Sequence, residues 1–187
     1  GGVFEYFTTI LGFGHYGQGS TMGLAPYGEP TFDVSRHLSA RSFDDHDIHD
    51  RGIIEAFGHL RRHRLDPMDK AHLDLAASVQ RALEDLVVTL IRDGLGAPTS
   101  QAPLSLAGGV ALNCAMNQRI RQDCGLPSLF VQPAAHDAGT ALGAALEAHY
   151  RLTGQAQVEP MTHAYLGRSY SDGQIIDALQ AFGLPFE

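Results

Sequence analysis

Two turns in the second half of the chain carry residues that could bind a nucleotide and a metal ion. Each turn ends a strand-like apolar run and begins a helical pattern, and open α/β sheets bind ligands at such carboxyl ends of strands. The first is Gly108–Val110, followed by Asn113; a Gly-Gly turn lets the backbone approach a phosphate or a ribose closely. The second carries Asp137 and Gly139, and an acidic residue there can hold a metal ion near the phosphate. The pattern predicts nucleotide and metal chemistry but does not fix the reaction.

Each of these features also has a structural interpretation. Asp137 precedes a helix, where an acidic side chain can serve as an N-cap, and the two roles are compatible. The Gly-Gly pair can be a plain tight turn, but the amide of Asn113 favours ligand contact because it can bond a ribose or a phosphate. His136 is expected at the surface rather than as a ligand. His46 and His49 lie in the acidic segment DDHDIHD, which is typical of a solvated loop rather than a metal site.

A set of short strands and longer helices is expected to position the two turns. The clearest element is a helix over 67–93, which begins at Asp66-Pro67 and repeats apolar residues at helical spacing. Strands are expected at 3–13, 103–107 and 129–132, and further helices at 20–25, 51–60, 111–123, 138–152 and 171–181. The strands at 103–107 and 129–132 should pair in parallel, with the helices over 67–93 and 138–152 covering the sheet. Residues 153–165 are expected to form an extended linker, and Tyr27 to pack.

The composition excludes several classes of protein. With 187 residues the chain can bury one good core. Its net charge is −8, and such an acidic surface repels nucleic-acid backbones. No apolar run approaches the roughly 18 residues of a membrane span, and no signal peptide is visible. The two cysteines, Cys114 and Cys124, are expected to be buried apolar side chains in a reducing compartment. We therefore expect a cytoplasmic protein without a membrane or nucleic-acid partner.

Four ordered blocks of the sequence carry a family resemblance. They are LGFGHYGQGSTMGLAPYGEP, the long helix ending in LVVTLIRDGLG, LSLAGGVALNCAMNQRI, and LFVQPAAHDAGTALGAALEAHY. A fifth block, MTHAYLGRSYSD, looks like an exit linker. In this order the set resembles the nodulation-protein and cephalosporin O-carbamoyltransferase family, over most of the chain apart from the stretch near 31–65.

The resemblance implies a fold and an activity. The fold is α/β, a lobe of the actin-like ATPase (ribonuclease H-like) domain with a mixed sheet covered by helices, similar to that of the tRNA threonylcarbamoyl transferases. In such enzymes a carboxy-terminal YrdC-like domain makes carbamoyl-adenylate from ATP and carbamoyl phosphate. The amino-terminal domain then passes the carbamoyl group to a hydroxyl of a sugar or an antibiotic-type small molecule.

The resemblance also implies site residues. Asp137, in HDAG, matches a late aspartate that holds a divalent metal, iron in the related enzymes, together with histidines of an early His-x-x-x-His motif. The chain departs from the family at Ser20, because the family has Gly-Glu-Gly-Lys where this sequence has Gly-Gln-Gly-Ser. The residues expected to line the nucleotide, ATP or carbamoyl-adenylate, are Gly17, Gly19, Gly108, Gly109, Val110 and Asn113.

The early His-x-x-x-His motif of the family is missing before His15, although His59 and His63 have the same spacing later in the chain, and no second domain fits after residue 165. Residues 1–155 are therefore expected to be the second lobe of the actin-like carbamoyltransferase domain, and 156–187 a linker toward a missing YrdC-like domain. On this interpretation the isolated chain is inactive, a small molecule is the hydroxyl acceptor, the missing domain supplies carbamoyl-adenylate, and a homodimer is possible. Two alternatives stay open: a tRNA threonylcarbamoyl transferase-like protein, against which the acidic charge argues, and a non-catalytic nucleotide-binding module of actin-like fold.

Overall fold

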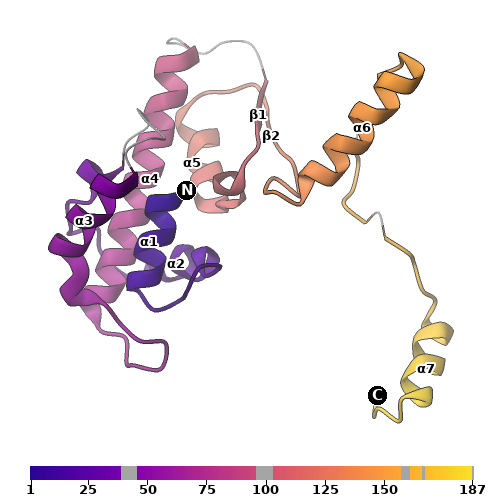
Figure 1. Ribbon diagram of the computed structural model, residues 1–187, viewed down its shortest axis with the longest axis horizontal. Coiled ribbons are helices and arrows are strands. Elements are labelled where there is room, and N and C mark those ends of the chain that lie inside the picture. Colours follow the sequence, from indigo (N-terminus) through magenta and orange to yellow (C-terminus); the bar gives the residue numbers. More distant parts are fainter. Residues whose placement is uncertain (39–45, 96–102, 157–160, 166, 187) are drawn as a thin grey trace. The chain divides into compact units, whose positions relative to one another are not determined.

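The computed structural model describes residues 1–38, 46–95, 103–156, 161–165 and 167–186, without the side chains of 46–50 and 95. Contacts divide the chain into two units, Gly1–Ala144 and Ala145–Glu187. Figure 1 shows the elements. The α-helices are α1 (Gly2–Ile10), α2 (Gln18–Leu24), α3 (His46–Phe57), α4 (Lys70–Leu95), α5 (Cys114–Asp123), α6 (Gly139–Thr153) and α7 (Asp172–Ala181). The strands are β1 (Leu104–Leu106) and β2 (Leu129–Val131), and the 3₁₀ helices are η1 (Ala25–Tyr27), η2 (Ser35–His37), η3 (Gly58–Leu60) and η4 (Gly109–Leu112). The fold class is α/β, with mostly helices and a small parallel sheet.

The first segment forms a helix, so the prediction of a strand at 3–13 is wrong. Its aromatic and β-branched residues suggested a strand, but the buried positions are Phe4, Phe7, Thr8, Ile10 and Leu11. These positions recur at intervals of three and four residues, which is the spacing of one helix face. Burial of that face against the core therefore decides the structure of α1 over the strand propensity of its residues.

The long helix α4 is the centre of the first unit. It packs against α1, α2, α5 and η1, and its buried face carries Leu75, Ala76, Val79, Leu83 and Val88. Its start differs from the predicted one at Asp66-Pro67. The Asp69 side chain accepts a hydrogen bond from His72 N (3.2 Å), and His72 Nδ1 accepts one from Asp69 N (3.2 Å), so this reciprocal pair caps the helix.

The two strands form a parallel pair, as predicted. Leu104 pairs with Leu129, Ser105 with Phe130, and Leu106 with Val131. Leu104, Leu106 and Leu129 pack on the same core as α4 and α5. The helix predicted at 138–152 is present as α6, and none of its described residues is buried. Most of α6 belongs to the second unit, so its predicted place over the sheet stays a prediction. In the described part of the chain, no helix is long and apolar enough to cross a membrane.

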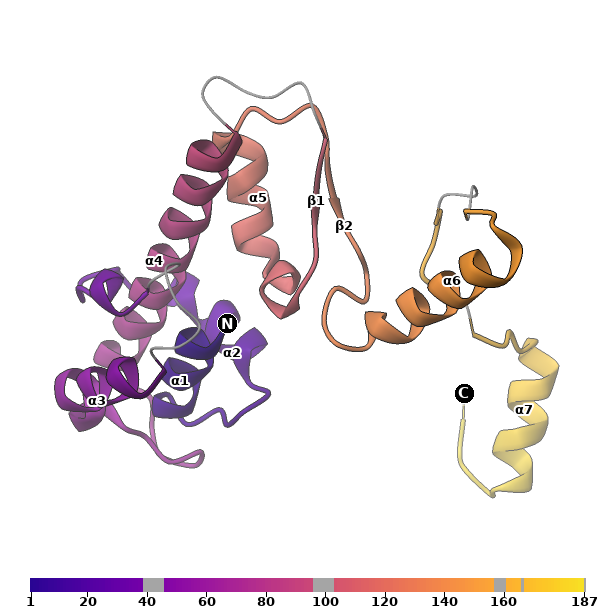
Figure 2. The same cartoon turned by 45° about the horizontal axis from the view of Figure 1, so that its top comes forward.

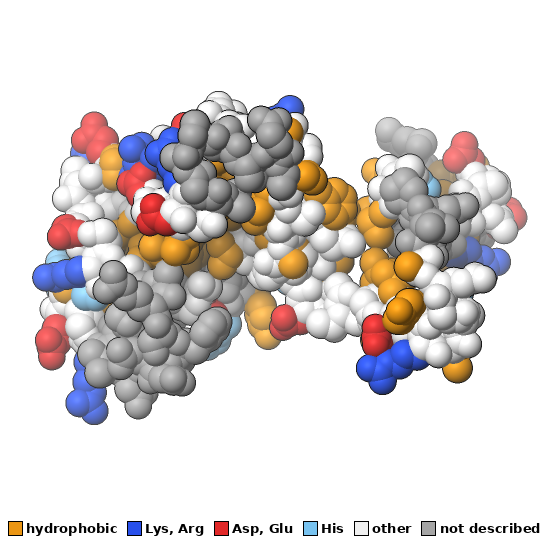
Figure 3. Space-filling view, turned by 90° about the horizontal axis from the view of Figure 1, so that it is seen from above, with side chains coloured by type: hydrophobic (Ala, Val, Ile, Leu, Met, Phe, Trp, Pro, Cys, Tyr) orange, Lys and Arg blue, Asp and Glu red, His pale blue; other side chains and the backbone are white. Residues whose placement is uncertain are grey.

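The second unit contains the end of α6 and the short helix α7. Ser171 caps α7, because its Oγ accepts a hydrogen bond from Gln174 N (3.3 Å) and the Gln174 side chain accepts one from Ser171 N (3.0 Å). No described residue of α7 is buried. Apolar side chains such as Tyr150, Leu152 and Phe182 are exposed, and Figure 3 shows apolar groups on the surface of the chain.

The start of α4 has an acid-sensitive contact. Asp74 accepts hydrogen bonds from Lys70 Nζ (2.9 and 2.8 Å) and from Glu29 N (2.8 Å), which ties the segment after η1 to the helix. The hydrogen bond from Lys70, and after it the one from Glu29 N, lower the pKa of Asp74 below its usual value. A lowered folded-state pKa gives stability that is complete above the unfolded value of about 3.9 and is lost as pH falls through the folded value.

We therefore expect Asp74→Asn to lower the free energy of unfolding at pH 7, and the difference from wild type to shrink below about pH 4. Urea unfolding between pH 7 and pH 3 measures this difference. Asp177→Asn is the control, because Asp177 is exposed and makes no hydrogen bond or ion pair with any described residue. An equal effect of Asp74→Asn at pH 7 and pH 3 would contradict the assignment.

Candidate functional site

The two predicted turns meet in the structure. β1 leads into the turn at Gly108 and β2 into the turn that contains Asp137, and both turns lie at the same end of the parallel pair (Figure 2). Gly108 N donates a hydrogen bond to Ala135 O (2.8 Å), which joins the turns directly. Gly108 has φ +95°, a backbone conformation that favours glycine. The predicted placement of both turns at the carboxyl ends of neighbouring strands is confirmed.

Asp137 presents an open carboxylate. The residue is exposed, and its side chain makes no hydrogen bond with any residue that the structure describes. Other atoms accept hydrogen bonds from the backbone N–H groups at the start of α6. Asp137 O accepts from Thr140 N (3.0 Å), and His136 Nδ1 accepts from Ala138 N (3.2 Å). His136 is a surface residue, as predicted. The carboxylate of Asp137 is therefore not used as a helix cap and can meet a ligand.

The described residues do not complete a metal site around this carboxylate. Among them, no three His, Cys, Asp or Glu side chains lie close enough together to hold a metal ion. The side chains of His46 and His49 lie outside the described part of the chain, although the backbone there is helical in α3 rather than a loop. One carboxylate is too few ligands for a structural or catalytic metal, so a site at Asp137 requires ligands from elsewhere.

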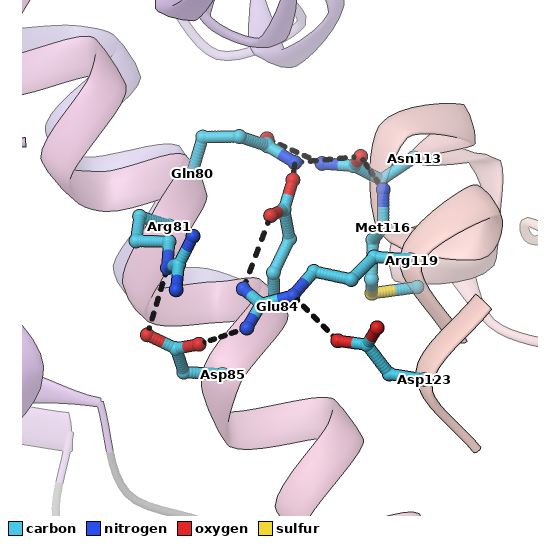
Figure 4. A network of polar contacts seen from close by, with 8 residues as sticks. All are labelled: Gln80, Arg81, Glu84, Asp85, Asn113, Met116, Arg119 and Asp123. Carbon is cyan, nitrogen blue, oxygen red and sulfur yellow. Dashed lines mark hydrogen bonds and ion pairs between the residues drawn. The ribbon is translucent and has the colours of Figure 1, made fainter. Parts of the chain in front are cut away.

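Asn113 is held by hydrogen bonds within the protein. Its Oδ1 accepts from Met116 N (3.0 Å), so Asn113 is the N-cap of α5. The same side chain makes two hydrogen bonds with Gln80 of α4 (Figure 4): Gln80 Nε2 donates to Asn113 Oδ1 (3.0 Å), and Asn113 Nδ2 donates to Gln80 Oε1 (2.8 Å). Contact of Asn113 with a nucleotide stays a prediction, and the structure adds a cap and a pairing role.

Gln80 is the residue at this site that the sequence analysis missed. A signal was present: Gln80 stands four residues after Ala76 and three before Leu83, both on the buried face of α4, and is itself only 5% exposed. A polar residue on an apolar helix face needs a buried partner. The sequence gives no sign that the partner is Asn113, which lies 33 residues further along the chain.

An ion-pair network fixes α5 against α4 beside this amide pair (Figure 4). Arg119 contacts Glu84 (3.3 Å), Asp85 and Asp123 (3.2 Å). Burial lowers the pKa of Arg119, but hydrogen bonds to Asp85, Asp123 and Glu84 outweigh it and raise the pKa above its ordinary value. The network therefore stays charged and sets the position of the helix that Asn113 caps.

The remaining predicted glycines lie at the start of α2. Gly17 is the N-cap position of α2, and a Cβ there would lie 2.4 Å from Phe13 Cβ, so packing alone requires a small residue. A Cβ at Gly19 would meet no atom within 4 Å. The sulfur atoms of Met22 and Cys114 are 3.8 Å apart, which places α2 next to the start of α5. Nucleotide contact by Gly17 and Gly19 stays a prediction.

Two predictions of burial are wrong. Tyr27 is 75% exposed, whereas Ala25 of the same 3₁₀ helix is buried. Cys114 is exposed, whereas Cys124 is buried as expected. The buried face of α5 runs through Met116, Ile120 and Cys124 at four-residue spacing, and Cys114 lies off that face.

The two thiols should therefore differ in reactivity. Burial raises the pKa of the Cys124 thiol, with nearby Arg92 acting in the opposite direction, and a buried thiol with a raised pKa gives little thiolate. We expect Ellman's reagent at pH 8 to modify one thiol quickly in the folded chain and both in 6 M guanidinium. Cys114→Ser should remove the fast reaction and Cys124→Ser should keep it. Two fast thiols in the folded wild type would contradict this packing of α5.

Known proteins match the chain over most of its length. The family profile described as Carbamoyltransferase N-terminus matches residues 1–146. Nodulation protein NolNO of Sinorhizobium fredii is 38% identical over 192 residues, which cover 95% of this chain and 27% of that protein. Nodulation protein NolO of Bradyrhizobium diazoefficiens is 39% identical over 180 residues, which cover 90% of this chain and 32% of that protein. A 3′-hydroxymethylcephem-O-carbamoyltransferase of Streptomyces clavuligerus is 39% identical over 57 residues, 30% of this chain and 11% of that protein.

The family profile includes both turns of the site, because it runs from Gly1 through α4, Gly108 and Asp137 into α6. The chain spans about a third or less of the length of the two nodulation proteins, 27% of one and 32% of the other. The profile covers well over half of the chain, and the nodulation proteins align with nearly all of it. The chain belongs to the carbamoyltransferase family.

Proposed function

We propose that the chain is part of an ATP-dependent O-carbamoyltransferase and forms part of the surface that holds carbamoyl-adenylate. The observation that carries the proposal is the hydrogen bond from Gly108 N to Ala135 O. In a chain of this family, it joins the glycine turn to the turn that carries the open carboxylate of Asp137. The printed name of the cephem relative describes transfer to the oxygen of a hydroxymethyl group on a small molecule. A hydroxyl of a sugar or an antibiotic-type compound is accordingly the proposed acceptor.

The proposed fold of the parent domain is the actin-like ATPase fold. The parallel pair β1–β2, with α4 and α5 on one core, is what one lobe of such a domain would contribute. In that fold the nucleotide lies against turns that follow strands. The N–H groups of Gly109 and Val110 begin η4, so they have no partner inside that turn and are the donors proposed for the phosphate.

The proposed reaction is acyl transfer. The acceptor oxygen attacks the carbonyl carbon of carbamoyl-adenylate and forms a new C–O bond. The bond from that carbon to the phosphate oxygen breaks, AMP leaves with the electron pair, and the hydroxyl proton passes to solvent. Asp137 is proposed as one ligand of a divalent metal at this place; the metal's other ligands would come from elsewhere, because the described residues do not complete a metal site.

Binding and turnover, measured separately, test the proposal. We expect calorimetry to show ATP binding by the chain, and Gly108→Val to weaken it, since a β-branched residue at φ +95° is strained by about 1–3 kcal/mol and would move the turn. We expect no carbamoylated product from the chain alone with labelled carbamoyl phosphate, ATP and a hydroxymethylcephem, because the described residues leave the metal site incomplete. Gly23→Ala is the control for binding. Product above the enzyme-free blank would contradict the expectation that the chain alone is inactive, and no ATP binding would contradict the proposed nucleotide surface.

A further inference from the structure

Gln80 and Asn113 form a reciprocal amide pair that links α4 to the predicted nucleotide turn. The two hydrogen bonds measure 3.0 Å (Gln80 Nε2 to Asn113 Oδ1) and 2.8 Å (Asn113 Nδ2 to Gln80 Oε1). Figure 4 shows the two amides facing each other across the gap between the helices. Gln80 is 5% exposed, so water competes little for these bonds.

The orientation of both amides is fixed by groups that can act in only one way. Glu84 Oε1 accepts from Gln80 Nε2 (2.7 Å), and an ionised carboxylate can only accept, so the nitrogen of Gln80 must face Glu84. At the other end, Met116 N can only donate, so the oxygen of Asn113 must face it (3.0 Å). The pairing therefore runs in one direction, from the carboxylate of Glu84 through the two amides to the backbone of α5. A flip of either amide would place its oxygen against the oxygen of the other amide and its nitrogen against the other nitrogen.

These hydrogen bonds hold Asn113, which is one end of the turn Gly108–Asn113. The other end is fixed by the bond from Gly108 N to Ala135 O (2.8 Å). Between the two ends lie Gly109 and Val110, whose N–H groups are the donors proposed for the phosphate. Holding a binding loop in its bound shape raises affinity because less freedom is lost on binding.

We propose that Gln80 is a positioning residue: it orients Asn113 and thereby fixes the turn Gly108–Asn113 for nucleotide binding. The proposal rests on the proposed function only in naming the nucleotide as the ligand of that turn. Gln80 itself touches no substrate. The alternative is a purely stabilising residue, which would lower the stability of the fold without changing the turn or its affinity.

The test compares Gln80→Met, which keeps the side-chain length but removes both hydrogen bonds, with Gln80→Glu, which can still accept from Asn113 Nδ2 but cannot donate. Asp74→Asn is the control for lost stability, since Asp74 lies near the start of α4 and binds Lys70 and Glu29 instead. Gln122→Met is the control for the substitution itself, since Gln122 is exposed on α5. All measurements are made on the whole 187-residue chain at a temperature at which each variant is folded.

Amide NMR spectra and ATP calorimetry provide the two readouts. We expect both Gln80 variants to shift the backbone amide resonances of Gly109 and Val110. We also expect Gln80→Met to weaken ATP binding about tenfold, a loss of about 1.4 kcal/mol. Asp74→Asn and Gln122→Met should leave both readouts near wild type. Unshifted Gly109 and Val110 resonances in Gln80→Met would overturn the proposal, as would unchanged ATP affinity with a lowered melting temperature. If the wild-type chain binds no ATP, the proposed function fails, and the resonances alone still decide whether Gln80 positions the turn.

Discussion

Replacement of Gly28 by alanine is expected to cost about 3 kcal/mol of stability, which corresponds to a fall of about 10 °C in melting temperature for a chain of this size. A Cβ at Gly28 would lie 2.1 Å from Leu73 O, 2.2 Å from Leu73 C and 2.6 Å from Asp74 N, and all three are backbone atoms of α4. Side chains can rotate away from a new methyl group, but the backbone of a buried helix cannot. The segment after η1 would have to leave α4 and would lose the hydrogen bond from Glu29 N to Asp74 (2.8 Å).

The expected effect of Gly28→Ala is steric and not conformational. Gly28 has φ −116° and ψ 177°, an extended conformation that alanine adopts freely. Gly23→Ala is the matched control, because Gly23 lies inside α2 and a Cβ there meets nothing within 4 Å. That control should gain about 0.5–1 kcal/mol from helix propensity. Urea unfolding of the two variants measures the contrast, and equal small effects would mean that Gly28 does not pack on α4 as described.

The parts of the fold that the sequence predicts correctly are those in which one local signal dominates. The helix over 67–93 has apolar residues at helical spacing over several turns, and it is present as α4. The short apolar runs near 104–106 and 129–131 are strands because each is bounded by turn residues. The segment 3–13 shows where two signals conflict. Its composition favours a strand, its spacing favours a helix, and the core at Phe7 and Leu11 follows the spacing.

The site was predictable where it depends on the backbone and not where it depends on distant partners. The Gly-Gly pair and the acidic residue after the next strand locate the two turns, because parallel strands bring their carboxyl ends to one edge. The partner of Asn113 comes from α4, and no short-range rule connects residues so far apart in sequence. Asp69 also replaces Asp66 as the cap of α4, since the choice between two nearby acids depends on the reciprocal bond with His72.

In the intact carbamoyltransferase of which this chain is proposed to be a part, Asp137→Ala is expected to lower carbamoyl transfer about a hundredfold or more and to leave carbamoyl-adenylate formation nearly unchanged. Loss of groups that merely support a metal ligand costs about 10–100-fold, so loss of an anionic ligand itself should cost at least as much. Adenylate formation is assigned to another domain, so it should not depend on this carboxylate. The fold should survive within about 0.5 kcal/mol, because Asp137 is exposed and its side chain makes no hydrogen bond with any described residue.

Pyrophosphate release and acceptor carbamoylation, followed separately in Asp137→Ala, distinguish these steps, with bound metal measured on the same samples. His136→Ala is the matched control, since its ring accepts a hydrogen bond from Ala138 N (3.2 Å) in the same turn. If His136→Ala impairs transfer as much as Asp137→Ala, the loss comes from the shape of the turn and not from the carboxylate. If both half-reactions fall together, Asp137 does not act on the transfer step alone. Transfer and metal content at wild-type levels in Asp137→Ala would show that the carboxylate has no part in the site, and the open position of Asp137 beside the Gly108 turn would then be without chemical consequence.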